Sequence, residues 1–285
     1  MASIKYSCVM DKAPKFHKQT LIWAQTLIGL ANQKPESIIV HAINGCNPET
    51  LDKLNSLGII LKMVDPFDPR SPYCNKLLQL ETPELQEADY AVLCDCDLAF
   101  CEDIAPWVVG DTVKAKVVGE NNPSFKIWKK ILKAAGIPGP YPKIKPTYAY
   151  KKTYANNCNG GLYLIPKKIF GQLKESWPRW CYWMLDNVHL LEKYKIHSDQ
   201  VSFGLAMAEL GMVVEQLSQE FNFATQRKYS PAIFNRRFNV TPKVIHFHNA
   251  IDDAGLLLKV GLENVDKEIE RTNIFLKSRQ ANVDE

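Results

Sequence analysis

Short apolar runs alternate with amphipathic stretches through the first half of this chain of 285 residues. Between the first two runs, residues 20–30 carry apolar side chains at helical spacing. Parallel strands need a long connection between neighbours, usually a helix, so this alternation favours an α/β fold. The strands that we expect lie at 5–10, 37–43, 59–64, 90–93 and 114–118.

Helical stretches connect these strands and continue through the second half of the chain. We expect helices at 48–57, 75–80, 168–194 and 199–211, with strands at 161–166 and 243–247. A chain of this length suits one large domain with a full core. The prediction is therefore a single α/β domain with a Rossmann-like, mostly parallel central sheet flanked by helices. Residues 1–250 would form it, and residues 251–285 a C-terminal helical tail.

The charge balance is mildly basic, with a formal net charge of +4 and a sequence pI near 8.5. No dense Lys/Arg block interleaved with aromatic residues stands out, which argues against a nucleic-acid partner. The basic excess suits an anionic substrate such as a nucleotide diphosphate, or a peripheral contact with a membrane surface that carries an acceptor.

The first ten residues are too polar for a signal peptide, and no apolar run approaches the length of a membrane span. We therefore expect a cytoplasmic protein, peripheral at a membrane at most. Its eight cysteines are interpreted as reduced, small hydrophobic residues. The group Cys94, Cys96 and Cys101 lacks a second Cys/His pair at zinc-finger spacing, which argues against zinc.

Asp95 and Asp97 follow the apolar run at 90–93. Residues i and i+2 of an extended chain project to the same side, so both carboxylates can face one ion. Hard cations such as Mn²⁺ and Mg²⁺ take oxygen ligands, and such a cation can bridge the phosphates of a nucleotide diphosphate. The alternative is that the two carboxylates only cap the next turn.

Three later segments carry polar groups beside expected elements. Asn159 and Gly160 form a polar, open approach to a strand, where amides can read sugar hydroxyls, although an ordinary turn has the same composition. Asp199 lies at a helix start, where it could simply be an N-cap. His246 and His248 end a strand at positions i and i+2, and one imidazole beside two aspartates would complete a mixed N/O metal site.

These segments together resemble a known family. The stretch from about residue 5 to residue 248 is similar to the GT-A glycosyltransferases, nearest to the glycogenin-like glycosyltransferase family 8. The resemblance rests on four motifs in the family's order: Asp95-Cys96-Asp97, Asn159-Gly160-Gly161-Leu162, Asp199-Gln200 and Val244-Ile245-His246. Residues 75–77 and 217–223 also resemble stretches of the family.

The resemblance implies roles for individual residues. The metal, Mn²⁺ or Mg²⁺, would be held by Asp95, Asp97 and His246, and the catalytic residues would be Asp199 and Gln200. Residues implied in binding the nucleotide sugar, which is expected to be UDP-linked, are Met10, Asp11, Lys76, Asp95, Asn159 and Gly160.

The implied reaction moves a hexose from the donor to an acceptor hydroxyl, with retained anomeric configuration. The acceptor, a glycan, a lipid-linked molecule or a protein, is left open. One alternative is an inverting enzyme with Asp199 as general base, and another is a non-catalytic protein that binds nucleotide sugars. A phosphatase of the haloacid dehalogenase kind is disfavoured because its Asp-x-Asp motif follows the first strand.

One part of the family pattern is missing. The Lys-Pro-Trp that usually follows the metal histidine is absent, so another residue must steady the departing diphosphate. Lys259, Arg236 and Arg237 are the candidates. The tyrosine-rich loop at 138–154 is a candidate lid over the acceptor, or else a surface excursion.

Overall fold

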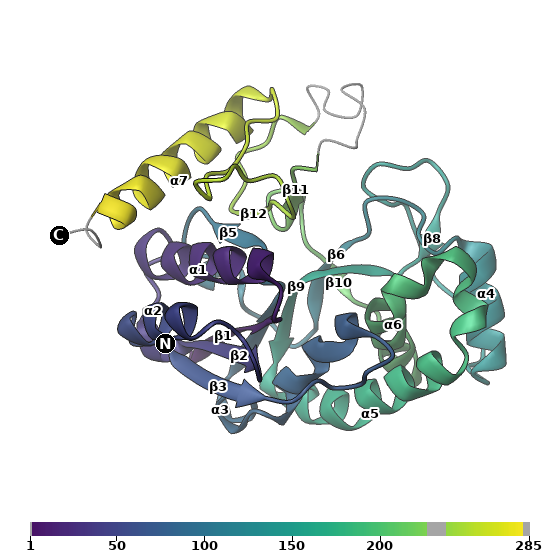
Figure 1. Cartoon of the computed structure of the whole chain (residues 1–285). Coiled ribbons are helices and arrows are strands. Elements are labelled where there is room, and N and C mark those ends of the chain that lie inside the picture. The colour runs from purple at the N-terminus through teal and green to yellow at the C-terminus, as the bar shows by residue number, and fades with distance from the viewer. Residues whose placement is uncertain (1, 227–237, 282–285) are drawn as a thin grey trace. The chain divides into compact units, whose positions relative to one another are not determined.

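A computed structural model describes residues 2–226 and 238–281 of the chain (Figure 1). The chain divides into two compact units, which are described separately. The first unit comprises Met1–Lys5, Asp65–Leu93 and Gly110–Leu217. The second comprises Tyr6–Val64, Cys94–Val109 and Ser218–Glu285.

The first unit is built on four strands in the order β10-β6-β9-β4. Strand β6 pairs antiparallel with β9 and parallel with β10. These strands are β4 (Tyr90–Cys94), β6 (Lys114–Val117), β9 (Cys158–Pro166) and β10 (Glu215–Gln216). A short hairpin adds β7 (Lys143–Ile144) and β8 (Thr153–Tyr154).

Helices of the first unit pack against this sheet and against one another. The α-helices are α3 (Pro83–Glu87), α4 (Phe125–Ala134), α5 (Lys167–Asp186) and α6 (Ser198–Glu209). Two 3₁₀ segments, η2 (Pro72–Glu81) and η4 (Val188–His197), join them. The aromatic centre of the core consists of Tyr163 of β9, Trp177 of α5 and Phe203 of α6, whose rings meet mostly edge to face.

The second unit begins with three parallel strands in the order β1-β2-β3. They are β1 (Ile4–Met10), β2 (Ile38–Ile43) and β3 (Ile60–Val64). A smaller sheet has the order β11-β12-β5, from β5 (Leu98–Phe100), β11 (Phe223–Ala224) and β12 (Val244–His246). The helical segments are α1 (Pro14–Gly29), η1 (Pro35–Ser37), α2 (Pro48–Ser56), η3 (Ala105–Trp107) and α7 (Glu263–Ala281), which packs on α1.

The α/β class expected from the sequence is confirmed. The central sheet has seven strands, mostly parallel where pairs are resolved, and helices flank it. Asn47 caps α2, and its side chain accepts a hydrogen bond from the Thr50 amide at 3.2 Å. The division into residues 1–250 and a tail stays a prediction.

Three expected elements differ from the structure. The helix expected at 75–80 is the 3₁₀ segment η2. The helix expected at 168–194 ends at Asp186, and the chain continues as η4, where Glu192 has a φ of 54° that no α-helix contains. The last expected strand, 243–247, shortens to β12.

All eight cysteines are buried free thiols, as expected of small hydrophobic residues. Among the described residues, no helix is both long enough and apolar enough to cross a membrane.

Candidate metal and donor-sugar sites

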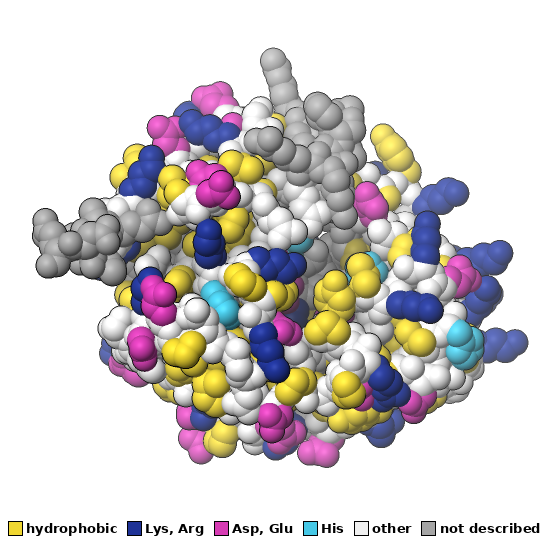
Figure 2. Space-filling view, in the orientation of Figure 1, with side chains coloured by type: hydrophobic (Ala, Val, Ile, Leu, Met, Phe, Trp, Pro, Cys, Tyr) yellow, Lys and Arg dark blue, Asp and Glu magenta, His cyan; other side chains and the backbone are white. Residues whose placement is uncertain are grey.

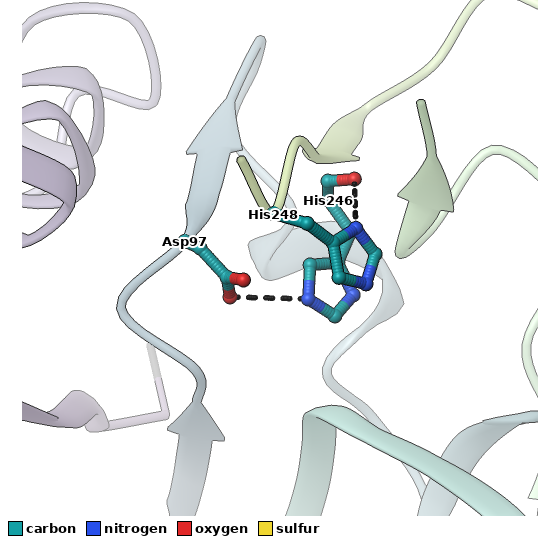
Figure 3. A group of neighbouring side chains, drawn as sticks. All are labelled: Asp97, His246 and His248. Carbon is teal, nitrogen blue, oxygen red and sulfur yellow. Dashed lines mark hydrogen bonds and ion pairs between the residues drawn. The ribbon is translucent and has the colours of Figure 1, made fainter. Parts of the chain in front are cut away.

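The metal-site candidates of the second unit meet because of strand pairing. Asp97 lies in the turn before β5, and His246 is the last residue of β12. The antiparallel pairing of these strands sets His246 opposite Leu98, the residue after Asp97. His248 follows two residues later. Figure 3 shows the carboxylate of Asp97 facing the imidazole of His246, with the His248 ring stacked on it.

The distances define a compact group. Nε2 of His246 lies 3.0 Å from Oδ1 of Asp97 and 3.9 Å from Oδ2 of Asp95. The rings of His246 and His248 stack with centroids 3.6 Å apart. Asp97, His246 and His248 each offer one ligand atom, and these atoms all lie within 4.8 Å of one another. The structure thus groups two of the three expected ligands with His248, while Asp95 lies beside them.

Hydrogen bonds fix which nitrogen of each imidazole carries a proton. Nδ1 of His248 lies 3.0 Å from the carbonyl oxygen of His246, which can only accept. Nδ1 of His246 lies 2.7 Å from Oδ1 of Asn222, also an acceptor. Both rings therefore keep their proton on Nδ1 when neutral, and each Nε2 presents a lone pair. Oxygen acceptors behind ligating histidines are the usual support of a metal site.

The group suits a divalent cation. Oδ1 of Asp97 is buried and makes no hydrogen bond within the described part of the chain, although Nε2 of His246 is only 3.0 Å away. Two acceptors this close repel each other unless a cation or a proton lies between them. A separation of 3.0 Å also matches two adjacent ligands of an octahedral cation with bonds of about 2.1 Å. One carboxylate and two imidazoles form a mixed set that suits borderline divalent metals.

Electrostatics at this site favour the ionised carboxylate. Without a metal, burial opposes the charge of Asp97, but the positive charge that His246 and His248 carry when protonated outweighs this effect and holds the pKa of Asp97 below its usual range. The neighbouring thiol of Cys96 behaves oppositely, since burial and the charges of Asp97 and Asp95 raise its pKa. Asp97 is therefore ionised, and Cys96 stays a thiol.

Two supporting residues were given no role at the sequence level. Asn222 lies in the stretch 217–223 that resembles the family, so the sequence held a signal for it. Gln19 of α1 carried no such signal. It is buried, donates from Nε2 to the carbonyl of His248 at 2.5 Å, and lies 3.9 Å from Sγ of Cys96 through Oε1. Gln19 thus connects the aspartate turn to the histidine turn.

Two of the residues expected to bind the nucleotide sugar, Met10 and Asp11, lie at the carboxyl end of strand β1. Met10 is fully buried, and its carbonyl oxygen accepts a contact from the thiol of Cys46 at 3.6 Å. Asp11 is partly exposed and accepts a hydrogen bond from the amide of Lys12 at 2.6 Å. Asp11 is therefore the polar side chain at this end of β1.

The remaining predicted residues form a second cluster in the first unit. Lys76 of η2 is buried and donates from Nζ to the carbonyl oxygen of Gly160 in β9. A methyl group built on Gly160 would lie 3.0 Å from Nζ of Lys76, 3.2 Å from Cγ of Gln200 and 3.5 Å from Oδ2 of Asp199. Only a glycine lets these three side chains converge here without displacement.

Hydrogen bonds support the members of this cluster. The indole of Trp177 donates to the carbonyl oxygen of Asp199 at 3.1 Å, which anchors the first turn of α6. Nε2 of Gln200 lies 3.3 Å from Nδ1 of His197. Oδ1 of Asn159 accepts from the amide of Gly161 at 2.9 Å. Asn159 therefore has a structural role, because its side-chain oxygen stabilises its own turn. This role accompanies the sugar-binding role that the sequence predicts for it.

Of the proposed substitutes for the missing Lys-Pro-Trp, only Lys259 lies among the described residues. Lys259 is exposed and pairs with Glu270 at 3.0 Å. Arg236 and Arg237 lie outside the described residues. The loop at 138–154, expected to be a lid or a surface excursion, forms the β7–β8 hairpin.

Comparisons with known proteins match this chain to glycosyltransferases. A family model described as the Rhodobacterales glycosyltransferase domain matches residues 12–211. No curated protein sequence matches the chain.

Solved glycosyltransferase structures share the fold. A crystal structure of an active-site mutant of LgtC has a TM-score of 0.59 at 15% identity and covers 96% of this chain and 95% of its own. The galactosyltransferase LgtC in complex with donor and acceptor sugar analogues gives 0.55 at 16% identity, with the same coverage. Mouse xyloside xylosyltransferase 1 gives 0.50 at 13% identity, over 86% of this chain and 98% of that one.

Proposed function

Because this chain belongs to the Rhodobacterales glycosyltransferase domain family, we propose that it transfers a hexose from a UDP-linked sugar to an acceptor hydroxyl with the help of Mn²⁺. The family match over residues 12–211 is the observation that carries the glycosyltransferase activity. The donor, the metal and the retaining course are parts of the proposal. The solved relative with bound donor and acceptor sugar analogues supports the use of a sugar donor.

The metal would be held by Asp97, His246 and His248, with Asp95 as a further oxygen ligand or a contact to the ribose. When bound there, a cation would neutralise the charge that develops on the departing diphosphate. Nitrogen ligands favour Mn²⁺ over Mg²⁺, which prefers carboxylates and water. Asn222 and Gln19 would hold this group in place through the contacts described above.

The donor sugar would be bound by the cluster around Gly160. Lys76 supplies a buried positive charge for the donor, and Asn159 supplies an amide for a sugar hydroxyl. In a retaining reaction, Asp199 and Gln200 steady the positive charge that develops at the anomeric carbon. In an inverting reaction Asp199 would instead take the acceptor proton. Analysis of the anomeric configuration of the product by NMR separates these two courses.

Donor hydrolysis with added metal tests the proposal. UDP-hexoses would be screened by thermal shift with Mn²⁺, and hydrolysis of the best donor would be compared in Mn²⁺ and in chelator. We expect Mn²⁺ to stimulate hydrolysis, and Asp97→Asn or His246→Ala to abolish that stimulation without loss of fold. Asp52→Asn, an exposed carboxylate of α2, serves as the matched control. Donor binding without any turnover would identify a non-catalytic nucleotide-sugar-binding protein instead.

A companion variant asks which residue is the third ligand. His248 has a φ of 51°, a region that glycine adopts freely, so His248→Gly removes the imidazole without straining the backbone. We expect this variant to lose about tenfold in Mn²⁺ affinity, measured by titration of free Mn²⁺ with EPR, and less in Mg²⁺ affinity. An unchanged Mn²⁺ affinity, with a loss in Asp95→Asn, would return the role to Asp95.

A further inference from the structure

The positive charge of this chain is concentrated in one segment. Residues 121–174 contain eleven lysines and no Asp, Glu or Arg. The whole chain carries a formal net charge of +4, so removing the +11 of this segment leaves −7 for the rest. The mild overall balance therefore conceals a strong asymmetry, which is typical of proteins that bind an anionic surface.

The structure gathers eight of these lysines on one side of the first unit. Four lie along α4 at helical spacing, opposite the buried stripe that includes Trp128 and Ile131. The other four lie on the β7–β8 hairpin, which packs against α4. The lysine face consists of Lys126, Lys129, Lys130, Lys133, Lys143, Lys145, Lys151 and Lys152, all exposed. Figure 2 shows Lys and Arg side chains gathered over this region.

The charges of the lysine face are largely uncompensated. In the ranges 2–226 and 238–281, only Lys130 of this set has a carboxylate partner, Glu192, at 3.3 Å. Lysines of the same segment that lie on α5 are paired instead, Lys168 with Asp111 and Lys174 with Glu81. Fold stability therefore does not require the lysine face to be charged.

Exposed apolar side chains accompany these lysines. Tyr150, in the loop of the hairpin, is 85% exposed, and Nζ of Lys145 lies 5.3 Å from the centre of its ring. Ile196 of η4, a segment that packs against α4, is 52% exposed. Tyrosine beside lysine is the pairing found at the boundary between lipid headgroups and acyl chains.

We propose that the lysine face docks this protein on the surface of an anionic lipid bilayer. Each lysine near such a surface strengthens partitioning by about fivefold, so several lysines acting together give stable peripheral attachment. The exposed Tyr150 inserts at headgroup level, a contact that a soluble polyanion does not offer. This attachment is independent of the metal and of the donor.

Vesicle sedimentation tests the proposal with the full chain. Binding to vesicles of phosphatidylcholine would be compared with binding to vesicles in which about 30% of the lipid is phosphatidylglycerol. This fraction gives a strongly anionic surface. We expect binding only to the anionic vesicles, weakening as salt is raised. The variant Lys126→Gln/Lys129→Gln/Lys133→Gln should lower the partition coefficient by about 100-fold. Glutamine keeps the helix propensity of these exposed positions, so the fold is retained.

Matched variants separate the lysine face from net charge. Lys15→Gln/Lys34→Gln/Lys277→Gln removes the same charge from exposed positions of the second unit and should bind vesicles like the parent. Tyr150→Ser should weaken vesicle binding severalfold and leave binding to soluble polyphosphate unchanged. Equal losses in both triple variants, equal binding to neutral vesicles, or binding to polyphosphate without binding to anionic vesicles would each overturn the proposal.

Discussion

At the scale of single residues, Asn222 explains how a histidine is prepared to bind a metal. Its side chain accepts the Nδ1 proton of His246, so the lone pair of Nε2 faces Asp97. Its backbone has a φ of 53°, which Asn, Asp and Gly tolerate better than other residues. These two properties can be separated by substitution.

We predict that Asn222→Gly, which keeps the backbone conformation but loses the acceptor, weakens Mn²⁺ binding by about 10- to 100-fold. Asn222→Asp keeps an acceptor oxygen and should stay within a few-fold of the parent. Calorimetric titration with Mn²⁺ in the absence of donor measures both. If the glycine variant bound Mn²⁺ as tightly as the parent, the orientation of His246 would not depend on Asn222.

The candidate metal site was predictable from sequence only in part. Asp97 and His246 stand in motifs that resemble the family, and the structure brings them together. The strand pattern alone did not distinguish His246 from His248, because alternation along a strand points both imidazoles the same way, and the choice of His246 rested on the family resemblance. After β12 the positive φ of His248 turns the chain and lays one ring on the other, a result of backbone geometry that side-chain periodicity does not encode.

At the scale of elements, two glycines of the first unit differ in what surrounds them. Gly204 of α6 lies where a methyl group would be 2.6 Å from the ring of Trp128 and 2.9 Å from the carbonyl oxygen of Asn156. Gly171 of α5 has no atom within 4 Å of that position. Gly204 permits close packing, whereas Gly171 lies on the exposed face of α5, where glycine only weakens the helix.

We predict opposite effects of alanine at these positions. Gly204→Ala should lower the free energy of unfolding by about 1–3 kcal/mol, because α6 must move away from Trp128. Gly171→Ala should raise it by up to about 1 kcal/mol through helix propensity. Urea unfolding followed by circular dichroism measures both, and a stabilised Gly204→Ala variant would contradict the packing described for α6.

Strand β6 contains a buried lysine that should make stability depend on pH. Burial lowers the pKa of Lys116 from 10.5 to about 7. Between these values the unfolded chain binds a proton that the folded chain does not, so the contribution of Lys116 to stability rises with pH from about 7 to 10.5.

The variant Lys116→Met removes this dependence. We expect it to raise the free energy of unfolding by about 2 kcal/mol at pH 7, with a smaller gain at pH 9.5. The gain at each pH is measured as the difference between variant and parent in urea unfolding. A gain that grew with pH would show that Lys116 is stabilised by its surroundings in the charged form.

The prediction of strands from sequence succeeded where the apolar runs were long. It failed where tertiary contacts determine whether a short segment forms a strand. The strands β1 to β4 lie within one residue of their expected positions at each end, since their apolar runs are bounded by polar residues. The three residues of β5 are too few for a period to be recognised. Strands β7 and β8 have two residues each and exist through their pairing with each other.

At the scale of the whole molecule, the predicted site residues fall into two groups, each within one unit. Met10, Asp11, Asp95, Asp97 and His246 belong to the second unit. Lys76, Asn159, Gly160, Asp199 and Gln200 belong to the first. The order of motifs along the chain indicated a glycosyltransferase correctly. The net charge summed over all residues, in contrast, concealed the lysine face.

The eight buried thiols have a consequence for how this protein can be followed in solution. Burial raises the pKa of Cys158 and of Cys101 to about 12, so neither forms a thiolate at neutral pH. The folded chain is therefore almost inert to alkylating reagents, and any modification reports a transient opening. Cys158 begins β9 in the first unit, and Cys101 follows β5 in the second. The alkylation rates of these two thiols therefore measure the opening of the two units separately.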